Sequence, residues 1–254
     1  MPTTVFVISA VLVFVFSGLL AMAGLGAAFL FVPMFYYLGV PLAEATSTAL
    51  LLNVVSLLFA AINYWRGKLI NWKVGLPVLI TAVILSPLGA RLTPFVDKKL
   101  LLGMFAAFLV FAGCMMLFYQ AKKRTQSLSR GTEIAAGAGV GSIAGFLGGM
   151  LGVGGGNFIL PVLNWIGLEA KVAAGTTAVV VVFSSLSGFL GHASLGGLDP
   201  VFITIMAVMA AGGSIVGSQL MKTKISNSQL KKLIGVLLLL IAAKMIWDLV
   251  KLAH

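Results

Sequence analysis

Charged side chains are scarce in this sequence. Only 9% of the 254 residues are Asp, Glu, Lys or Arg, whereas an average soluble domain carries about 25%. Apolar types make up 60%, and the mean hydropathy is +1.13. A soluble chain of this length cannot hide so much apolar surface, because small domains leave much of their surface exposed. The shortage of charge therefore favours a protein that is solvated by lipid.

Acidic residues and cysteine are also rare. The chain has six Asp and Glu residues against 17 Lys and Arg, and its formal net charge is +11. In a soluble protein that balance suggests nucleic-acid binding, but here the basic residues lie at the ends of apolar stretches, where lipid headgroups attract them. The single cysteine, Cys114, excludes a disulfide or a thiolate metal site within one chain. We expect the lipid bilayer as a partner, and no nucleic acid, metal or cofactor.

Long apolar stretches fill the rest of the sequence. A transmembrane helix needs about 20 apolar residues, and eight stretches reach that length with short connections between them. The predicted fold class is all-α, a polytopic membrane protein whose function lies inside the bilayer. The stretches are residues 5–38, 43–65, 73–93, 98–119, 132–166, 170–192, 199–221 and 228–250.

The two halves of the chain repeat one pattern. The sequence GLGAAFLFVP at 24–33 corresponds to GVGGGNFILP at 152–161, and ATSTA at 45–49 corresponds to AGTTA at 174–178. A polar stretch, QAKKRTQSLSRG, is the one segment long enough to join two halves. The predicted domains are a first four-span repeat (1–119), a polar linker (120–131) and a second four-span repeat (132–254).

Two of the apolar stretches are too long for one crossing. A helix over all of 5–38 would be about 51 Å long, whereas the hydrocarbon core is about 30 Å thick. Glycine has low helix propensity, so we expect breaks near Gly24–Gly26 and near Gly152–Gly156. The result would be glycine-broken or re-entrant half-helices that end near Leu38 and Ile166.

A break inside lipid leaves backbone groups that must be buried in protein or line a wet cavity. Free N–H groups and the positive end of the half-helix dipole then attract an anion, and paired breaks are typical of secondary transporters. Hydroxyl and amide side chains nearby would add donors, although Ser and Thr also bond their own helix backbone. The predicted substrate-binding residues are Gly24, Gly26, Thr46, Ser47, Thr48, Asn53, Gly152, Gly154, Gly155, Gly156, Asn157, Thr176 and Thr177.

Asn63 and His192 occupy corresponding places in the two halves, near the ends of their spans. We predict a gating or proton-coupling role for them, with an interfacial histidine as the alternative. Lys and Arg are missing from mid-span positions, except for Lys244 near the end of the last span. Their absence favours a small anion that is held by neutral donors and dipoles.

Glycine also recurs at every fourth residue before the second glycine motif. Gly137, Gly141, Gly145 and Gly149 share one face of a helix, where another backbone can approach closely. We interpret this stripe as tight helix packing without a ligand role.

Other function classes fit the sequence less well. No HExxH or GxSxG motif is present, and Ser187 and His192 are five residues apart, so they do not share a helix face. The GVGGGN run has Asn157 where a dinucleotide-binding loop needs glycine. We therefore expect no enzyme, and a channel-like or proton-coupled permease for another small solute, such as a carboxylate, is the alternative.

Eight crossings would put the linker and both chain termini on the same side of the membrane. Lys and Arg would then be nearly balanced between the two sides, so that the positive-inside rule does not decide. The compact basic group Lys122, Lys123 and Arg124 in the linker favours the cytoplasm for the linker and both termini.

At these motifs the sequence resembles the sulfite exporter TauE/SafE family of membrane permeases. The resemblance is carried by GVGGGNFILP at 152–161, AAGTTA at 173–178 and GHASLGGLD at 191–199. It implies a multi-pass transporter of the cell inner (plasma) membrane that moves a small sulfur oxyanion or organosulfonate, such as sulfite. Alternating access at the repeat interface is the implied mechanism, and a homodimer is compatible with it. The first half departs from the motif, with Ala27 and Ala28 in place of glycines, so the second half is expected to contribute more to the site.

Overall fold

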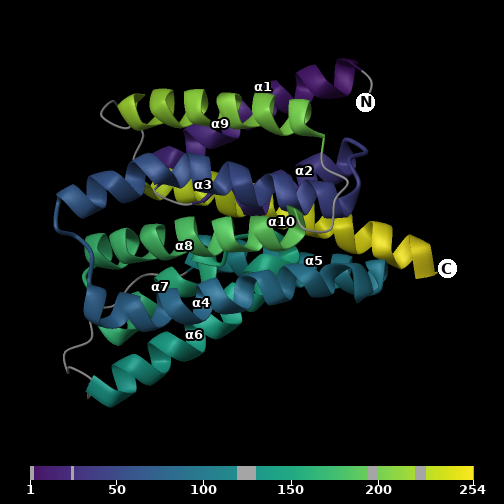
Figure 1. The fold of residues 1–254 in the computed structure, drawn as a ribbon. Helices are drawn as coiled ribbons and strands as arrows, with labels where there is room; N and C mark the ends of the chain where they lie inside the picture. The colour runs from purple at the N-terminus through teal and green to yellow at the C-terminus, as the bar shows by residue number, and fades with distance from the viewer. Residues whose placement is uncertain (1–2, 24–25, 119–129, 194–198, 221–226, 254) are drawn as a thin grey trace.

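The computed structural model describes residues 3–23, 26–118, 130–193, 199–220 and 227–253. Within these residues the chain forms ten α-helices and one short 3-10 helix, which confirms the all-α prediction (Figure 1). The helices are α1 (Thr3–Ala23), α2 (Ala28–Tyr37), α3 (Leu42–Arg66), α4 (Trp72–Leu92), η1 (Thr93–Phe95), α5 (Lys98–Phe118), α6 (Arg130–Leu151), α7 (Gly156–Ile166), α8 (Ala170–Ala193), α9 (Pro200–Leu220) and α10 (Asn227–Ala253).

The two over-long stretches are each divided into a long and a short helix. Residues 5–38 give α1 and α2, and residues 132–166 give α6 and α7. Among the described residues, five helices are long and apolar enough to cross a membrane: α3, α4, α5, α6 and α8. The short helices α2 and α7 are apolar, but at ten and eleven residues they span only about half of a hydrocarbon core.

Contacts between neighbouring helices define the direction of each one. Helix α8 is antiparallel to α3, because Gly188 lies beside Leu50 and Gly175 lies beside Tyr64. Helix α6 is parallel to α4, because Gly137 lies beside Val74 and Gly149 lies beside Ser86. Helix α8 is also parallel to α4, because Thr176 lies beside Gly75 and Gly191 lies beside Pro87. Helix α1 is parallel to α9, and α10 is antiparallel to α5.

The bundle therefore has two distinct ends. One end, on the left of Figure 1, we call the linker end. Four helices finish there (α3, α5, α7 and α9), and four start there (α4, α6, α8 and α10). At the opposite end, the terminal end, α1 begins and α10 finishes, so both chain termini lie on the right of Figure 1.

The pairs α1–α2 and α6–α7 do not cross the bundle as single spans. The pair α1–α2 starts and finishes at the terminal end, and α6–α7 starts and finishes at the linker end. The expected set of eight one-way crossings is thus wrong. The reason is that the half-helix after each break runs back toward the end of the bundle where the preceding long helix began. A long helix and its half-helix together therefore make no net crossing.

Aromatic side chains join α1, α2 and α9 in the larger of two apolar clusters. The ring of Phe202 lies 5.7 Å from that of Phe6 and 5.5 Å from that of Phe35, both edge to face. Phe35 and Phe202 are fully buried. Edge-to-face aromatic pairs add to the stabilisation from buried area, so α2 is held firmly between α1, α3 and α9.

The glycine stripe of α6 packs against α4. Gly137 lies beside Val74 and Val78, and Gly145 lies with its Cα directly against the backbone of Ala82. A Cβ at Gly145 would come within 2.5 Å of the Ala82 Cα atom. The interpretation of the stripe as a close helix contact is confirmed.

We predict that Gly145→Ala destabilises the protein, while Gly139→Ala on the same helix does not. The new methyl at Gly145 overlaps backbone that cannot rotate away, which costs about 1–3 kcal/mol, whereas no atom lies within 4 Å of a Cβ at Gly139. Thermal unfolding of the two purified variants in one detergent measures the difference. Equal melting temperatures would show that the α4–α6 contact is not tight.

Candidate functional site

Asn53, near the middle of α3, lies between the two breaks. Its side chain is fully buried. The amide Nδ2 donates a hydrogen bond to Ser185 Oγ at 3.0 Å, and Oδ1 accepts one from the backbone N–H of Ala28 at 3.4 Å. Gly26 and Gly154 both lie directly against this amide. The two chain breaks, distant in sequence, therefore meet at one side chain.

Glycine is required where the second break meets Asn53. Gly154 and Gly155 have φ values of +70° and +73°, a left-handed conformation that glycine adopts without the steric strain of other residues. A Cβ at Gly154 would overlap the Asn53 amide and Ser185 Oγ, and one at Gly155 would come within 2.6 Å of the Ala144 carbonyl oxygen. Gly155 is also the N-cap residue of α7.

A small cavity of about 20 Å³ lies beside Asn53, on the side of the linker end. This volume admits about one water molecule. It is bounded by the starts of α2 and α7, by the middle of α3 and by the first half of α8. The lining residues are Gly26, Phe29, Asn53, Leu57, Val153, Gly156, Asn157, Leu160, Ala174, Thr177, Ala178 and Val181.

Unpaired hydrogen-bond donors gather at this cavity. The backbone N–H groups of Gly156 and Asn157, in the first turn of α7, have no partner among the described residues. Thr177 Oγ1 is buried and also unpartnered. A buried hydroxyl group such as that of Thr177 is normally satisfied, and the positive end of the α7 dipole lies here. These donors and the dipole together are suited to an anion.

The cavity wall carries no formal charge. None of its lining residues is Asp, Glu, Lys, Arg or His. Within the described part of the chain, no three His, Cys, Asp or Glu residues are grouped so that they could hold a metal ion. Neutral donors and the helix dipoles are therefore the groups available to bind a ligand at this cavity.

The first half contributes less to the cavity than the second. The first N–H of α2, at Ala28, is occupied by Asn53, whereas the first two N–H groups of α7 are open. Phe29 occupies the position that corresponds to Asn157, so an aromatic ring replaces a polar side chain. The second glycine motif is thus the one with two open N–H groups at the cavity, and its larger share in substrate binding stays a prediction.

The cavity wall does not include the predicted residues Thr46, Ser47, Thr48, Gly152, Gly154, Gly155 or Thr176. Thr46 and Thr176 donate to the carbonyls of Leu42 and Val172 in their own helices, and Thr176 Oγ1 also accepts from Asn71. Ser47 and Thr48 are buried with unpartnered hydroxyl groups. Gly152 lies against Thr46, and Gly24 falls outside the described residues.

Asn63 and His192 are far apart. Asn63 is exposed near the linker end of α3. His192 is 3% exposed, and its Nε2 lies 3.0 Å from the Gly149 carbonyl oxygen near the end of α6. His192 thus lies in the last turn of α8 and packs against α6, and both its coupling role and the interfacial alternative stay predictions.

Ser185 and the apolar wall of the cavity were not among the predicted site residues. Ser185 occupies the place in the second half that Ser56 has in the first, and this correspondence is a signal that points to it. The apolar residues Phe29, Leu57 and Leu160 give no such signal, since they do not differ from their neighbours in type.

Comparison with known proteins assigns the class. The "Probable membrane transporter protein YunE" of Bacillus subtilis is 22% identical over 96% of this chain and 98% of its own length. The "Probable membrane transporter protein YdhB" of the same species is 28% identical over 76% and 81%, and the "Probable membrane transporter protein MJ0441" of Methanocaldococcus jannaschii is 27% identical over 66% and 65%. No solved structure matches the chain. The protein is a multi-pass membrane transporter, not an enzyme.

The family follows from a match along most of the chain. Residues 9–245 match the family model described as "Sulfite exporter TauE/SafE". The chain belongs to this family, which confirms the resemblance seen in its glycine motifs. The match includes both breaks, Asn53 and the whole cavity wall.

We predict that Asn53→Ala destabilises the protein much more than Asn63→Ala. Removing the buried amide leaves the Ala28 N–H and Ser185 without their partner, and an unsatisfied buried group costs about 1–3 kcal/mol. Asn63 is exposed on the same helix and serves as the matched control. Unfolding of both variants by a denaturing detergent gives the free energies. A similar loss in both would remove Asn53 from its role as the bridge between the breaks.

Proposed function

We propose that the protein is a secondary transporter of a small anion, which binds at the first turn of α7. The observation that carries the proposal is the group of open donors at one cavity: the N–H groups of Gly156 and Asn157 and the Thr177 hydroxyl. Anions bind at helix N-termini because the N–H groups and the dipole both favour negative charge. The buried, unpartnered hydroxyl is a second and independent sign of a missing ligand.

The positive charge available at the cavity limits which anions can bind there. Each of the two helix N-termini supplies about half a positive charge, and no basic side chain lines the cavity. A singly charged ion matches that supply better than a multivalent one, which would need an arginine or lysine. Together with the family, this supports a singly charged sulfur oxyanion or organosulfonate, such as sulfite in its singly protonated form, as the substrate.

Two inverted repeats give a basis for alternating access. Helices α1 to α5 come before the linker and the equivalent α6 to α10 come after it, in each case a long helix, a half-helix and three further α-helices. Equivalent helices run in opposite directions, as α3 and α8 do. In secondary transporters of this plan, one half rocks against the other around a site near mid-membrane.

The volume of the cavity indicates that this conformation does not hold the substrate. About 20 Å³ holds a water molecule but no oxyanion of four or more heavy atoms. The helices around Asn53 must therefore separate before the substrate enters. In this conformation the site is formed but too small for the substrate. We also propose that the protein is located in the plasma membrane.

We predict that Thr177→Val raises the KM for the transported anion by about tenfold or more, while Thr48→Val changes it little. A hydrogen bond to a charged group is worth about 1.5–3 kcal/mol, and tenfold corresponds to about 1.4 kcal/mol. Both hydroxyl groups are buried and unpartnered, but only Thr177 lines the cavity. Uptake of sulfite and methanesulfonate into proteoliposomes measures the effect. Equal KM values for Thr177→Val and the parent protein would refute binding at this cavity.

His192 provides a test of proton coupling. It is the one ionisable side chain buried within the described residues, and it touches the last turn of α6. We predict that His192→Gln keeps anion exchange but loses accumulation driven by a pH gradient. Proteoliposomes with and without an imposed gradient separate the two activities. Unchanged accumulation in the variant would exclude His192 as the coupling group.

A further inference from the structure

The basic residues are distributed very unevenly once each chain segment is assigned to an end of the bundle. Among the described residues, seven Lys and Arg lie at the linker end and five lie at the terminal end. Those of the linker end are Arg66, Lys68, Lys73, Arg130, Lys171, Lys231 and Lys232; those of the terminal end are Arg91, Lys98, Lys99, Lys244 and Lys251. The remaining five of the 17 fall outside the described residues, in the two sequences that join helices ending and starting at the linker end: Lys122, Lys123, Arg124, Lys222 and Lys224.

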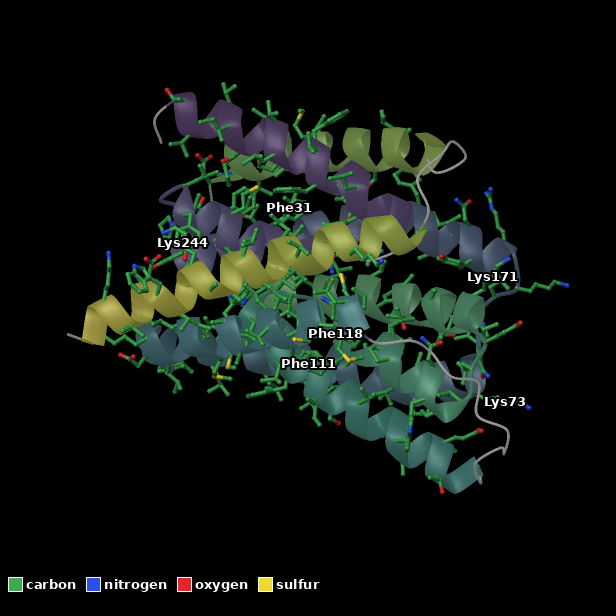
Figure 2. The ribbon with its side chains drawn as sticks, turned by 180° about the vertical axis from the view of Figure 1, so that it is seen from behind. Phe31, Lys73, Phe111, Phe118, Lys171 and Lys244 are labelled. Atoms are coloured by element: carbon green, nitrogen blue, oxygen red, sulfur yellow. The ribbon has the colours of Figure 1, made fainter. Side chains whose placement is uncertain are left out.

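From this distribution we infer that the linker end faces the cytoplasm and that both chain termini lie on the exterior side of the membrane. Short connections rich in Lys and Arg remain on the cytoplasmic side of a membrane, and the anionic lipids of that leaflet attract them. All connections in this chain are short enough for the rule to apply. Figure 2 shows Lys73 and Lys171 together at the linker end and Lys244 toward the opposite one.

This inferred orientation is the opposite of the one expected from eight crossings, in which the termini are cytoplasmic. The balance of charge found for eight crossings came from counting α1–α2 and α6–α7 as single spans, which shifted connections to the wrong side. With each pair returning to the end where it began, the bias becomes large.

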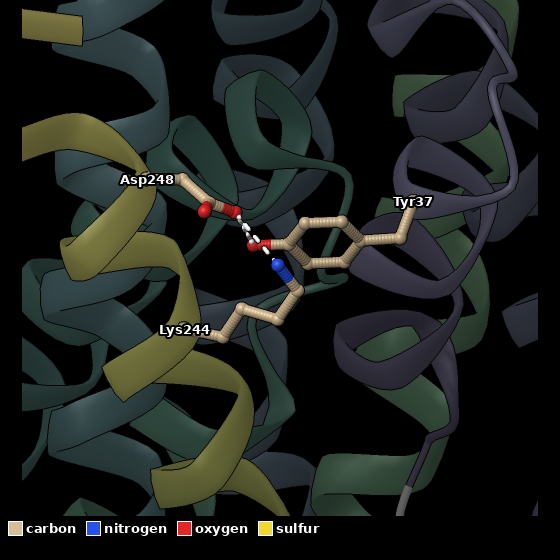
Figure 3. A network of polar contacts seen from close by, with 3 residues as sticks. All are labelled: Tyr37, Lys244 and Asp248. Carbon is tan, nitrogen blue, oxygen red and sulfur yellow. Dashed lines mark hydrogen bonds and ion pairs between the residues drawn. The ribbon is translucent and has the colours of Figure 1, made fainter. Parts of the chain in front are cut away.

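Two of the lysines at the terminal end contact neighbouring side chains, and these contacts are consistent with a bundle that is closed at this end. Lys244 Nζ and Tyr37 Oη both bond Asp248 Oδ2 at 3.1 Å, which ties the end of α2 to α10 (Figure 3). The Lys98 ammonium lies 5.4 Å from the centre of the Tyr36 ring. Such contacts join the half-helix to its neighbours at the side that the orientation assigns to the exterior.

The cavity lies on the cytoplasmic side of Asn53. Leu57 follows Asn53 by one turn toward the linker end, and Ala174 is one turn from the start of α8 at that end. On the other side of Asn53, Phe31 and Phe35 are fully buried. In this conformation the cavity is therefore nearer to the cytoplasmic end, and the exterior side of Asn53 is closed by packed side chains. The inference that the substrate site opens toward the cytoplasm rests on the proposed function.

Cysteine labelling in intact cells tests the orientation. In a Cys114→Ala background, Lys171→Cys and Lys251→Cys are a matched pair, since both lysines are exposed in helices at opposite ends. We expect a membrane-impermeant maleimide to label Lys251→Cys in intact cells, and both variants after permeabilisation. Labelling of Lys171→Cys in intact cells, alone or together with Lys251→Cys, would overturn the inference. The result does not depend on transport, so it stands apart from the proposed function.

A second pair tests the direction of access. Ala174 lines the cavity, while Ala45, its counterpart in the first half, is fully buried outside it. A small charged thiosulfonate is expected to modify Ala174→Cys faster in inside-out vesicles than in right-side-out vesicles, and to leave Ala45→Cys unmodified in both. Faster reaction of Ala45→Cys from the exterior would show that the site opens the other way.

Discussion

Backbone that leaves a helix within hydrocarbon has no water to satisfy its N–H and C=O groups, and each unsatisfied group costs several kcal/mol. The two breaks of this chain therefore need protein around them, and Asn53 and Ser185 lie where both need cover. The packing of the central helices follows from that need. Helices α3 and α8 cross at this point, and the glycines that touch Asn53 leave room for its amide.

The same constraint accounts for the difference between the halves. A break that is capped by a side chain, as α2 is by Asn53, is stable but has its first donor occupied. A break with open N–H groups, as in α7, leaves donors at the cavity that no described residue satisfies. The two breaks thus differ in how their first donors are satisfied, and Phe29 of one half and Asn157 of the other both line the cavity.

Helix positions were predictable because the bilayer restricts them strongly. Six of the eight apolar stretches became single helices with nearly the expected bounds, and length alone showed that the other two had to break. At the cavity, Gly156, Asn157 and Thr177 lie together with Asn53, and Gly154 packs against the Asn53 amide. Their role in substrate binding stays a prediction. Thr46 and Thr176 were less predictable, because a threonine that bonds its own helix has the same local sequence as one that faces a ligand.

The sequence by itself determined that the chain lives in a membrane, where its helices lie and where they break, because hydropathy, length and glycine content act locally. Only the tertiary structure decided the direction in which each half-helix returns, and so the number of crossings and the end to which each lysine belongs. A glycine break permits a turn of any angle, and the contacts of α2 with α3 and of α7 with α6 and α8 select one. The open donors at Gly156 and Asn157 depend in the same way on which neighbours reach them.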